Sequence, residues 1–160
     1  MPANAVTAVR PLTPADVPVV AAWVASVPLW QRYGLTAAGM QQRLEQALAA
    51  DDLLLTADSG ADRACGLAWV VRRGAFGRSA YLRLIGVRPD RAGGGAGAAL
   101  LAGAEAAAGD QLFLLVSDFN VDAQRFYARH GYTQIGAIPG FVLPDVTELI
   151  LWKRLSAAPA

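Results

Sequence analysis

A glycine-rich stretch near the middle of the chain has the composition of an anion-binding loop. Gly93-Gly94-Gly95-Ala96-Gly97 follows an apolar run that ends at Val87, and a segment rich in alanine and leucine comes after it. Glycine lets backbone N–H groups approach a ligand closely, and a helix N-terminus adds a partial positive charge. The stretch therefore predicts a cradle for phosphate or pyrophosphate, although a tight turn without function has the same pattern.

A second stretch whose residues could take part in binding or catalysis is Asn120–Tyr132, which combines an amide, aromatic rings and a late glycine. Ala123, Phe126, Tyr127 and His130 recur at steps of three and four residues, so they share one face of a helix. On such a face Tyr127 is either a proton donor, with a reference pKa of about 10, or an aromatic residue of the core.

The elements that must position these residues are helices and short strands, which together indicate an α/β (α+β) fold. Three predicted strands form a meander directly before the glycine loop, and a strand buried on both faces follows the next helix. Strands are expected at 6–9, 53–57, 65–71, 80–87, 112–116, 132–137 and 147–154, and helices at 13–27, 36–50, 95–108 and 120–130. Nothing divides the chain, so residues 1–155 are expected to form a single domain and 156–160 a frayed tail.

Composition narrows the function classes further. The chain has 160 residues, 54% hydrophobic and 17% charged, and its net charge of +1 argues against bulk attraction to nucleic acid. Cys65 is the single cysteine, which excludes an internal disulfide framework and a cysteine metal cluster. The chain shows no signal peptide and no membrane-spanning run, so we expect a cytoplasmic protein that binds neither a membrane nor a metal.

The two stretches resemble the signatures of one family. Val87-x-Pro89 with Gly93–Gly97 resembles the acetyl-CoA loop of the GNAT-superfamily N-acetyltransferases, and Asn120–Tyr132 is similar to that family's Asn-x-x-Ala-x-x-Phe-Tyr helix. The resemblance implies a mixed, mostly antiparallel, splayed sheet of about six to seven strands with about four helices. It also implies that acetyl-CoA lies between the strands at Tyr81–Val87 and Leu112–Val116.

The resemblance further implies a role for individual residues. Ala92 stands where the family usually has Arg or Gln, so either Arg91 or Arg88 would have to replace that side chain. The implied contacts are the backbone of Ile85, Gly86 and Val87 to the acetyl and pantetheine part, the amides of Gly93, Gly94, Gly95, Ala96, Gly97 and Ala98 to the pyrophosphate, Asn120 to the cofactor arm, and Tyr127 as the acid for the CoA thiolate.

No general base can be assigned from the sequence. The positions where the family often carries a carboxylate are Leu115 and Arg83 here, and neither can accept a proton. Asp118 and Glu148 are interpreted as turn or surface residues, and His130 as a histidine at a helix end.

The sequence therefore predicts an N-acetyltransferase that moves acetyl to a primary amine of a small molecule or peptide. A CoA-binding module without catalysis and a Rossmann-type dinucleotide binder are the alternatives. Trp30 and Tyr33 are candidates for a substrate wall, with hydrophobic plugs over the core as the other interpretation. The segment after Pro139 is a candidate edge for a homodimer.

Overall fold

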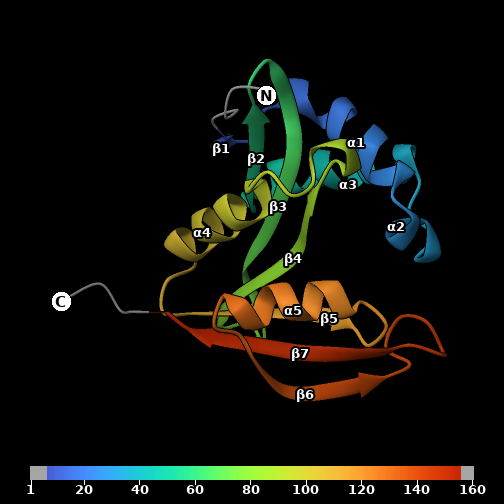
Figure 1. The fold of residues 1–160 in the computed structure, drawn as a ribbon, viewed down its shortest axis with the longest axis vertical. Helices are drawn as coiled ribbons and strands as arrows, with labels where there is room; N and C mark the ends of the chain where they lie inside the picture. The colour runs from blue at the N-terminus through green and yellow to red at the C-terminus, as the bar shows by residue number, and fades with distance from the viewer. Residues whose placement is uncertain (1–6, 156–160) are drawn as a thin grey trace. The chain divides into compact units, whose positions relative to one another are not determined.

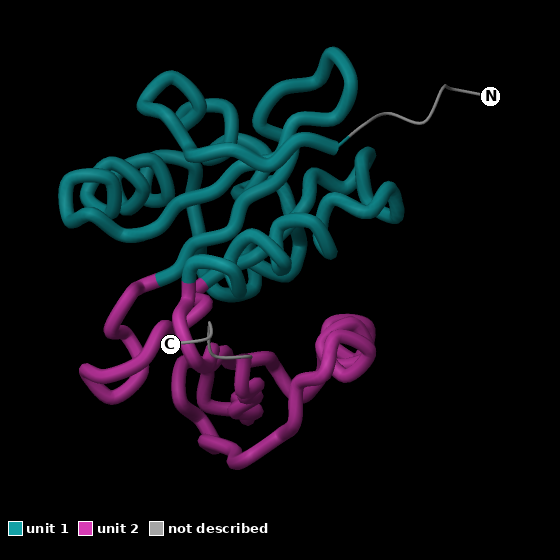
Figure 2. Tube along the Cα trace, turned by 90° about the vertical axis from the view of Figure 1, so that its left-hand side faces the viewer, with its two compact units in different colours: residues 1–70, 84–107 teal, residues 71–83, 108–160 magenta. Residues whose placement is uncertain are grey.

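The computed structural model describes residues 7–155, and these group into two compact units (Figure 2). Unit 1 comprises the residues up to Val70 and Leu84–Ala107, and unit 2 comprises Val71–Arg83 and the residues from Ala108 onward. The predicted frayed tail at 156–160 lies outside the described residues.

Seven strands, five α-helices and two short 3-10 segments make up the fold (Figure 1). In chain order they are β1 (Thr7–Pro11), η1 (Pro14–Asp16), α1 (Val17–Ser26), α2 (Pro28–Arg32), α3 (Ala37–Ala49), β2 (Leu53–Ser59), β3 (Asp62–Ala75), β4 (Ser79–Val87), η2 (Pro89–Arg91), α4 (Ala96–Ala108), β5 (Gln111–Ser117), α5 (Val121–Arg129), β6 (Thr133–Pro139) and β7 (Thr147–Arg154).

The strands join in one sheet in the order β1-β2-β3-β4-β5-β7-β6. Neighbours β1–β2, β2–β3, β5–β7 and β6–β7 are antiparallel, whereas β4 and β5 are parallel. This mixed, mostly antiparallel sheet confirms the predicted α/β fold, and it excludes the parallel sheet of a dinucleotide-binding fold. β6 is an edge strand, so the homodimer through the segment after Pro139 stays a prediction.

Capping residues explain where several predicted helices begin and end. The Thr36 hydroxyl accepts a hydrogen bond at the start of α3, and the Asn120 side-chain oxygen does so at the start of α5. Both satisfy backbone N–H groups that lack a partner within the helix. Gly109 and Gly131 follow α4 and α5 with φ of 89° and 90°, the left-handed conformation in which a glycine commonly ends a helix.

One predicted connector is helical in the structure. We expected Pro28 to end a helix and to be followed by an irregular segment, but α2 begins at Pro28 and carries Trp30. Proline is favourable at the first helical position, because the N–H group that it lacks would have no partner there. Pro28 is therefore the first residue of a new helix, two residues after α1 ends at Ser26.

The core of unit 1 forms between its helices and strands. α1 packs against α3, and both helices bury aliphatic side chains at helical spacing. α4 buries one leucine face, and a Cβ added at Gly103 would come within 3.0 Å of Leu55 on β2. The least exposed large side chains of these elements are Val17, Val20, Val24, Met40, Leu44, Leu100 and Leu101.

In unit 2, one face of the sheet is covered by α5, and we call it the α5 face. Its members Leu82, Leu114 and Leu151 lie opposite one another in the register of β4, β5 and β7, and all are buried. In Figure 1, α5 is drawn in front of β5 and above β7 in the view. The end of the helix is placed by Gly131, where an added Cβ would lie 3.4 Å from the Lys153 side chain.

The opposite face of these strands is more exposed, and we call it the Tyr81 face. Tyr81, Phe113 and Trp152 lie in register on it and are half-buried. Because side chains alternate along a strand, every second residue shares a face with them. The other members used below are Arg83 on β4, Leu115 and Ser117 on β5, and Glu148 and Ile150 on β7.

An arginine held by two aspartates fixes the start of unit 1. The Arg10 guanidinium donates to Asp16 at 2.7 and 3.0 Å and to Asp58 at 2.7 and 3.1 Å. Asp16 also accepts from the amide and hydroxyl of Thr13, and Asp58 accepts from the Ala64 amide at 2.8 Å. The network therefore joins β1 to the first helical turn and to β2.

Replacing Asp16 with asparagine is expected to lower the free energy of unfolding by about 2 kcal/mol at neutral pH, because a charged partner of Arg10 that is only 7% exposed is lost. Hydrogen bonds from Arg10 hold the pKa of Asp16 well below its usual value. This stabilisation is therefore present above about pH 4 and is lost as the pH falls further. Denaturant titrations should show the gap between wild type and variant narrowing between about pH 5 and pH 2.

The matched control is Asp90→Asn, which removes the partner of Arg88 in an exposed pair with 63% exposure of the carboxylate. This control should leave stability nearly unchanged. If the difference in the free energy of unfolding between Asp16→Asn and wild type did not change with pH, the stabilising role of the ionised Asp16 carboxylate would be contradicted.

Candidate active site

The predicted glycine loop begins where β4 ends and closes at the first residue of α4. η2 turns the chain directly after β4, and Ala92 is extended. Gly93 and Gly95 then have φ of 81° and 89°, the left-handed region that favours glycine. A Cβ added at either position would meet nothing within 4 Å, so the loop leaves open space beside its backbone.

The first turn of α4 supplies backbone donors next to that space. The first bond of the helix runs from the Ala99 amide to the Gly95 carbonyl at 3.0 Å. The amides of Ala96, Gly97 and Ala98 precede it and have no carbonyl partner within the helix. With the partial positive charge of a helix of 13 residues, this arrangement can bind an anion such as a phosphate.

The two arginines considered as replacements for a loop side chain both have carboxylate partners in unit 1. Arg88 donates to Asp90 at 2.5 Å and lies 3.8 Å from Asp62, and Arg91 pairs with Asp62. Asp62 begins β3, so these pairs hold the loop against the turn between β2 and β3. To bind a ligand phosphate, either arginine would have to leave its carboxylate partner.

Trp30 lies directly against the end of β4. A Cβ added at Gly86 would come within 2.2 Å of the Trp30 ring, so only glycine leaves room for this tryptophan. Trp23 contacts the same ring, with centroids 6.4 Å apart. The structure thus brings a predicted substrate residue onto the predicted cofactor segment Ile85–Val87, while Tyr33 lies beyond it at the C-terminal end of α2.

The remaining predicted site residues, Asn120 and Tyr127, lie in unit 2. Asn120 uses its side-chain oxygen to cap α5, accepting from the Ala123 amide at 3.2 Å. Tyr127 is only 6% exposed and points to the inner face of α5. Its ring packs edge-on against Phe126 and Tyr132, with centroids 5.3 and 5.6 Å apart.

The environment of Tyr127 keeps its hydroxyl protonated. Burial raises the pKa of the Tyr127 phenol above its ordinary value, and the nearby Tyr81 raises it further. The group can therefore donate a hydrogen bond or a proton throughout the physiological pH range. It is a weaker acid than a phenol in water, because burial disfavours the phenolate.

Three side chains considered as bases have different positions. Asp118 is exposed in the turn after β5 and accepts from the Thr147 amide, as the turn interpretation predicted. His130 is the C-cap of α5, with Nδ1 2.8 Å from the Phe126 carbonyl. Glu148 is only 5% exposed within β7, so its interpretation as a turn or surface residue was wrong.

Glu148 is thus the functional candidate that sequence reasoning passed over. The alternation in Thr147–Arg154 was the available signal, because it places Glu148 on the same side of the strand as Ile150 and Trp152.

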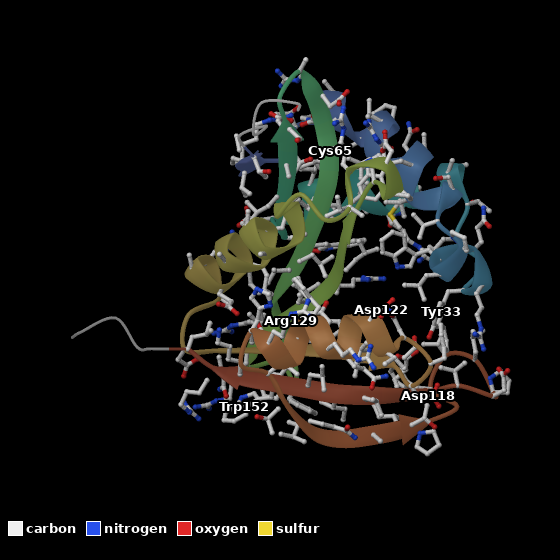
Figure 3. The ribbon with its side chains drawn as sticks, in the orientation of Figure 1. Tyr33, Cys65, Asp118, Asp122, Arg129 and Trp152 are labelled. Atoms are coloured by element: carbon white, nitrogen blue, oxygen red, sulfur yellow. The ribbon has the colours of Figure 1, made fainter. Side chains whose placement is uncertain are left out.

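The described residues, 7–155, offer no metal cluster and no membrane-spanning helix. Within that range, no cluster of three or more His, Cys, Asp or Glu side chains could hold a metal ion. The helices of the same range include none long and apolar enough to cross a membrane. Figure 3 labels Asp118 in the turn after β5 and Asp122 in the first turn of α5, both in unit 2.

Comparison with known proteins adds a family and a fold. The model of the Acetyltransferase (GNAT) family matches residues 20–132, which cover parts of both units. A search of curated proteins finds no match.

Solved structures with the same fold are also acetyltransferases. A GNAT-family acetyltransferase from Bacillus cereus is 13% identical, with a TM-score of 0.78 over 93% of this chain and 97% of that one. A ribosomal-protein-alanine N-acetyltransferase from Brucella melitensis is 20% identical, with a TM-score of 0.72 over 92% and 99%. An aminoglycoside 6'-N-acetyltransferase complexed with coenzyme A is 14% identical, with a TM-score of 0.74 over 96% and 99%. At these identities the likeness shows the fold alone.

The contact between Trp30 and Gly86 can be tested by a double-mutant cycle. Gly86→Ala is expected to lower the free energy of unfolding by about 1–3 kcal/mol, because its Cβ must displace the Trp30 ring. In a Trp30→Leu background the same change should cost much less, and denaturant titration measures both differences. Gly94→Ala is the control, since its Cβ would meet nothing nearer than 3.6 Å. Equal costs in both backgrounds would show that the ring does not occupy this space.

Proposed function

The chain belongs to the GNAT acetyltransferase family, and on this premise we propose that it transfers acetyl from acetyl-CoA to a primary amine of a small molecule or peptide. The observation that carries the proposal is the glycine loop of Gly93–Gly95, which ends β4 and opens onto the first amides of α4. We further propose that residues 1–155 act as one acetyltransferase domain, because the family match at 20–132 includes segments of both units.

The residues of unit 1 fit the donor molecule. Open space at Gly93 and Gly95 admits phosphate oxygens, and the amides of Gly93–Ala98 donate to the pyrophosphate. The backbone of Ile85, Gly86 and Val87 holds the acetyl and pantetheine part, and Trp30 lies beside it against Gly86. Bound acetyl-CoA supplies an activated thioester, and the chain orients it.

Residues of unit 2 complete the proposed reaction. Asn120 hydrogen-bonds the cofactor arm through the part of its amide that does not cap α5. Tyr127 donates its proton to the CoA sulfur as the neutral amine attacks directly, without an acetylated enzyme. Burial favours this role because the phenol remains protonated. Burial also makes the proton transfer itself less favourable, because it disfavours the phenolate that the transfer leaves behind.

Replacing Tyr127 with phenylalanine tests the acid. We expect kcat to fall about 10²- to 10³-fold, since the thiolate must leave without a proton donor. Acetyl-CoA affinity should be unchanged, and release of the CoA thiol with a panel of primary amines measures the rate. Tyr132→Phe is a matched control, because Tyr132 is equally buried at 7% and contacts the same ring. Equal rates for the Tyr127 and Tyr132 variants would remove Tyr127 from this role.

Two glycines with the same backbone strain test the cradle. Gly95 and Gly109 both have φ of 89° and open space beside them, at opposite ends of α4. Gly95→Val should weaken acetyl-CoA binding by about tenfold or more, or about 1.4 kcal/mol, because the side chain fills the phosphate position. Gly109→Val should bear the same strain without that loss. Calorimetric titration of both variants with acetyl-CoA measures the two affinities, and equal affinities would contradict the proposed cradle.

A further inference from the structure

Glu148 is a carboxylate in an unusual place. It is 5% exposed within β7, between Ser117 of β5 and Ile138 of β6 in the register of the sheet. Burying an ionisable side chain is costly, so a glutamate in a sheet interior needs compensating interactions, and the position also removes its carboxylate from bulk water.

The sheet register places Glu148 on the Tyr81 face. Its cross-strand partner Ser117 follows Leu115 by two residues, and Leu115 pairs with Ile150. Arg83 follows Tyr81 by two residues on β4, so it belongs to the same face. Arg83 and Leu115, which cannot accept a proton, therefore share a sheet face with the carboxylate of Glu148.

Tyr127 approaches the same strands from the opposite side. Its ring contacts Tyr132, and the Lys153 ammonium lies 5.6 Å from the Tyr132 ring centroid. Lys153 pairs with Leu112 and so belongs to the α5 face. A carboxylate on the Tyr81 face and a phenol on the α5 face lie on the two sides of β4, β5 and β7. This arrangement allows a base and an acid to act from opposite sides of these strands.

We propose that Glu148 is the acceptor-side carboxylate of the reaction, which binds the amino group of the acceptor and takes its proton. The inference rests on the proposed function, and it assigns the acceptor as an amine that binds in its protonated form. Glu148 would then be a catalytic residue, because it touches the reacting nitrogen.

The proposed step balances in protons and bonds. The acceptor's R–NH₃⁺ gives one proton to the Glu148 carboxylate, which later releases it to solvent. The resulting R–NH₂ forms the new N–C bond with the acetyl carbon while the C–S bond breaks. The thiolate takes the Tyr127 proton, and the second proton lost from the nitrogen restores the phenol through solvent. One proton is released for each amide and each CoA thiol formed.

Electrostatics within unit 2 support this placement. Burial raises the pKa of Tyr81, the positive charge of Arg83 opposes that shift and the negative charge of Glu148 adds to it. Arg83 and Glu148 thus both act on Tyr81 and must lie within electrostatic reach of it. A further charged group near Glu148 is Asp118, which lies in the turn that pairs with Thr147, and β6 brings the apolar Ile138.

Glu148→Gln is the experiment, because glutamine keeps the shape of the side chain but cannot take the proton. Two acceptors are compared at about pH 7: an alkylamine, protonated with a pKa of about 10.4 as for lysine, and methoxyamine, which is already neutral. The variant should lose about 10²-fold in kcat/KM with the alkylamine and much less with methoxyamine. Raising the pH should recover the alkylamine rate, while acetyl-CoA affinity stays that of wild type.

Asp118→Asn is the matched control, since it removes a carboxylate near Glu148 that is exposed in a turn. It should leave the ratio of the two rates unchanged. Equal losses of Glu148→Gln on both amines, or no loss on either, would overturn the proposal. If the glutamine variant does not fold, Glu148→Asp is subject to the same comparison: a larger loss on the alkylamine supports the role, and equal losses overturn it. Wild-type protein inactive on both amines would overturn the proposed function, and this inference with it.

Discussion

Parallel pairing of β4 with β5 is the constraint on which the rest of the arrangement depends. The register joins Ala80–Leu82 to Leu112–Leu114 in a sheet whose other described pairs are antiparallel. Two parallel strands cannot be joined by a hairpin, so the chain needs a crossover between them. That crossover is the glycine loop and α4, which explains why a helix N-terminus follows the carboxyl end of β4 directly.

The two kinds of group that acetyl transfer needs have different physical origins in this chain. The proposed anion binding uses the backbone, because glycine conformations and a helix start present the Gly93–Ala98 amides, and it needs no side chain at Ala92. The proposed proton transfers instead use side chains that the fold removes from water. Tyr127 and Glu148 are 6% and 5% exposed, so the sheet and α5 determine the surroundings of both side chains.

Local patterns were the predictable part of this structure. The strands, the glycine loop and the caps at Thr36, Asn120 and Gly131 follow from spacing and residue type within a few positions. The Arg10 network was not predictable, because Arg10 and Asp58 are 48 residues apart. The same holds for Trp30 on Gly86, which depends on how a short helix packs against a strand. Glu148 was read as exposed although its strand was predicted, since burial is decided by the neighbouring strands β5 and β6.

Direct detection of the acetylated product tests the central claim most directly. Wild-type protein would be incubated with acetyl-CoA and a set of primary amines, and mass spectrometry would follow the amines while a thiol assay follows free CoA. The account predicts that at least one amine gains a single acetyl group in step with the CoA released. Acetyl-CoA that binds but remains intact with every amine, or CoA release without an acetylated amine, would contradict it.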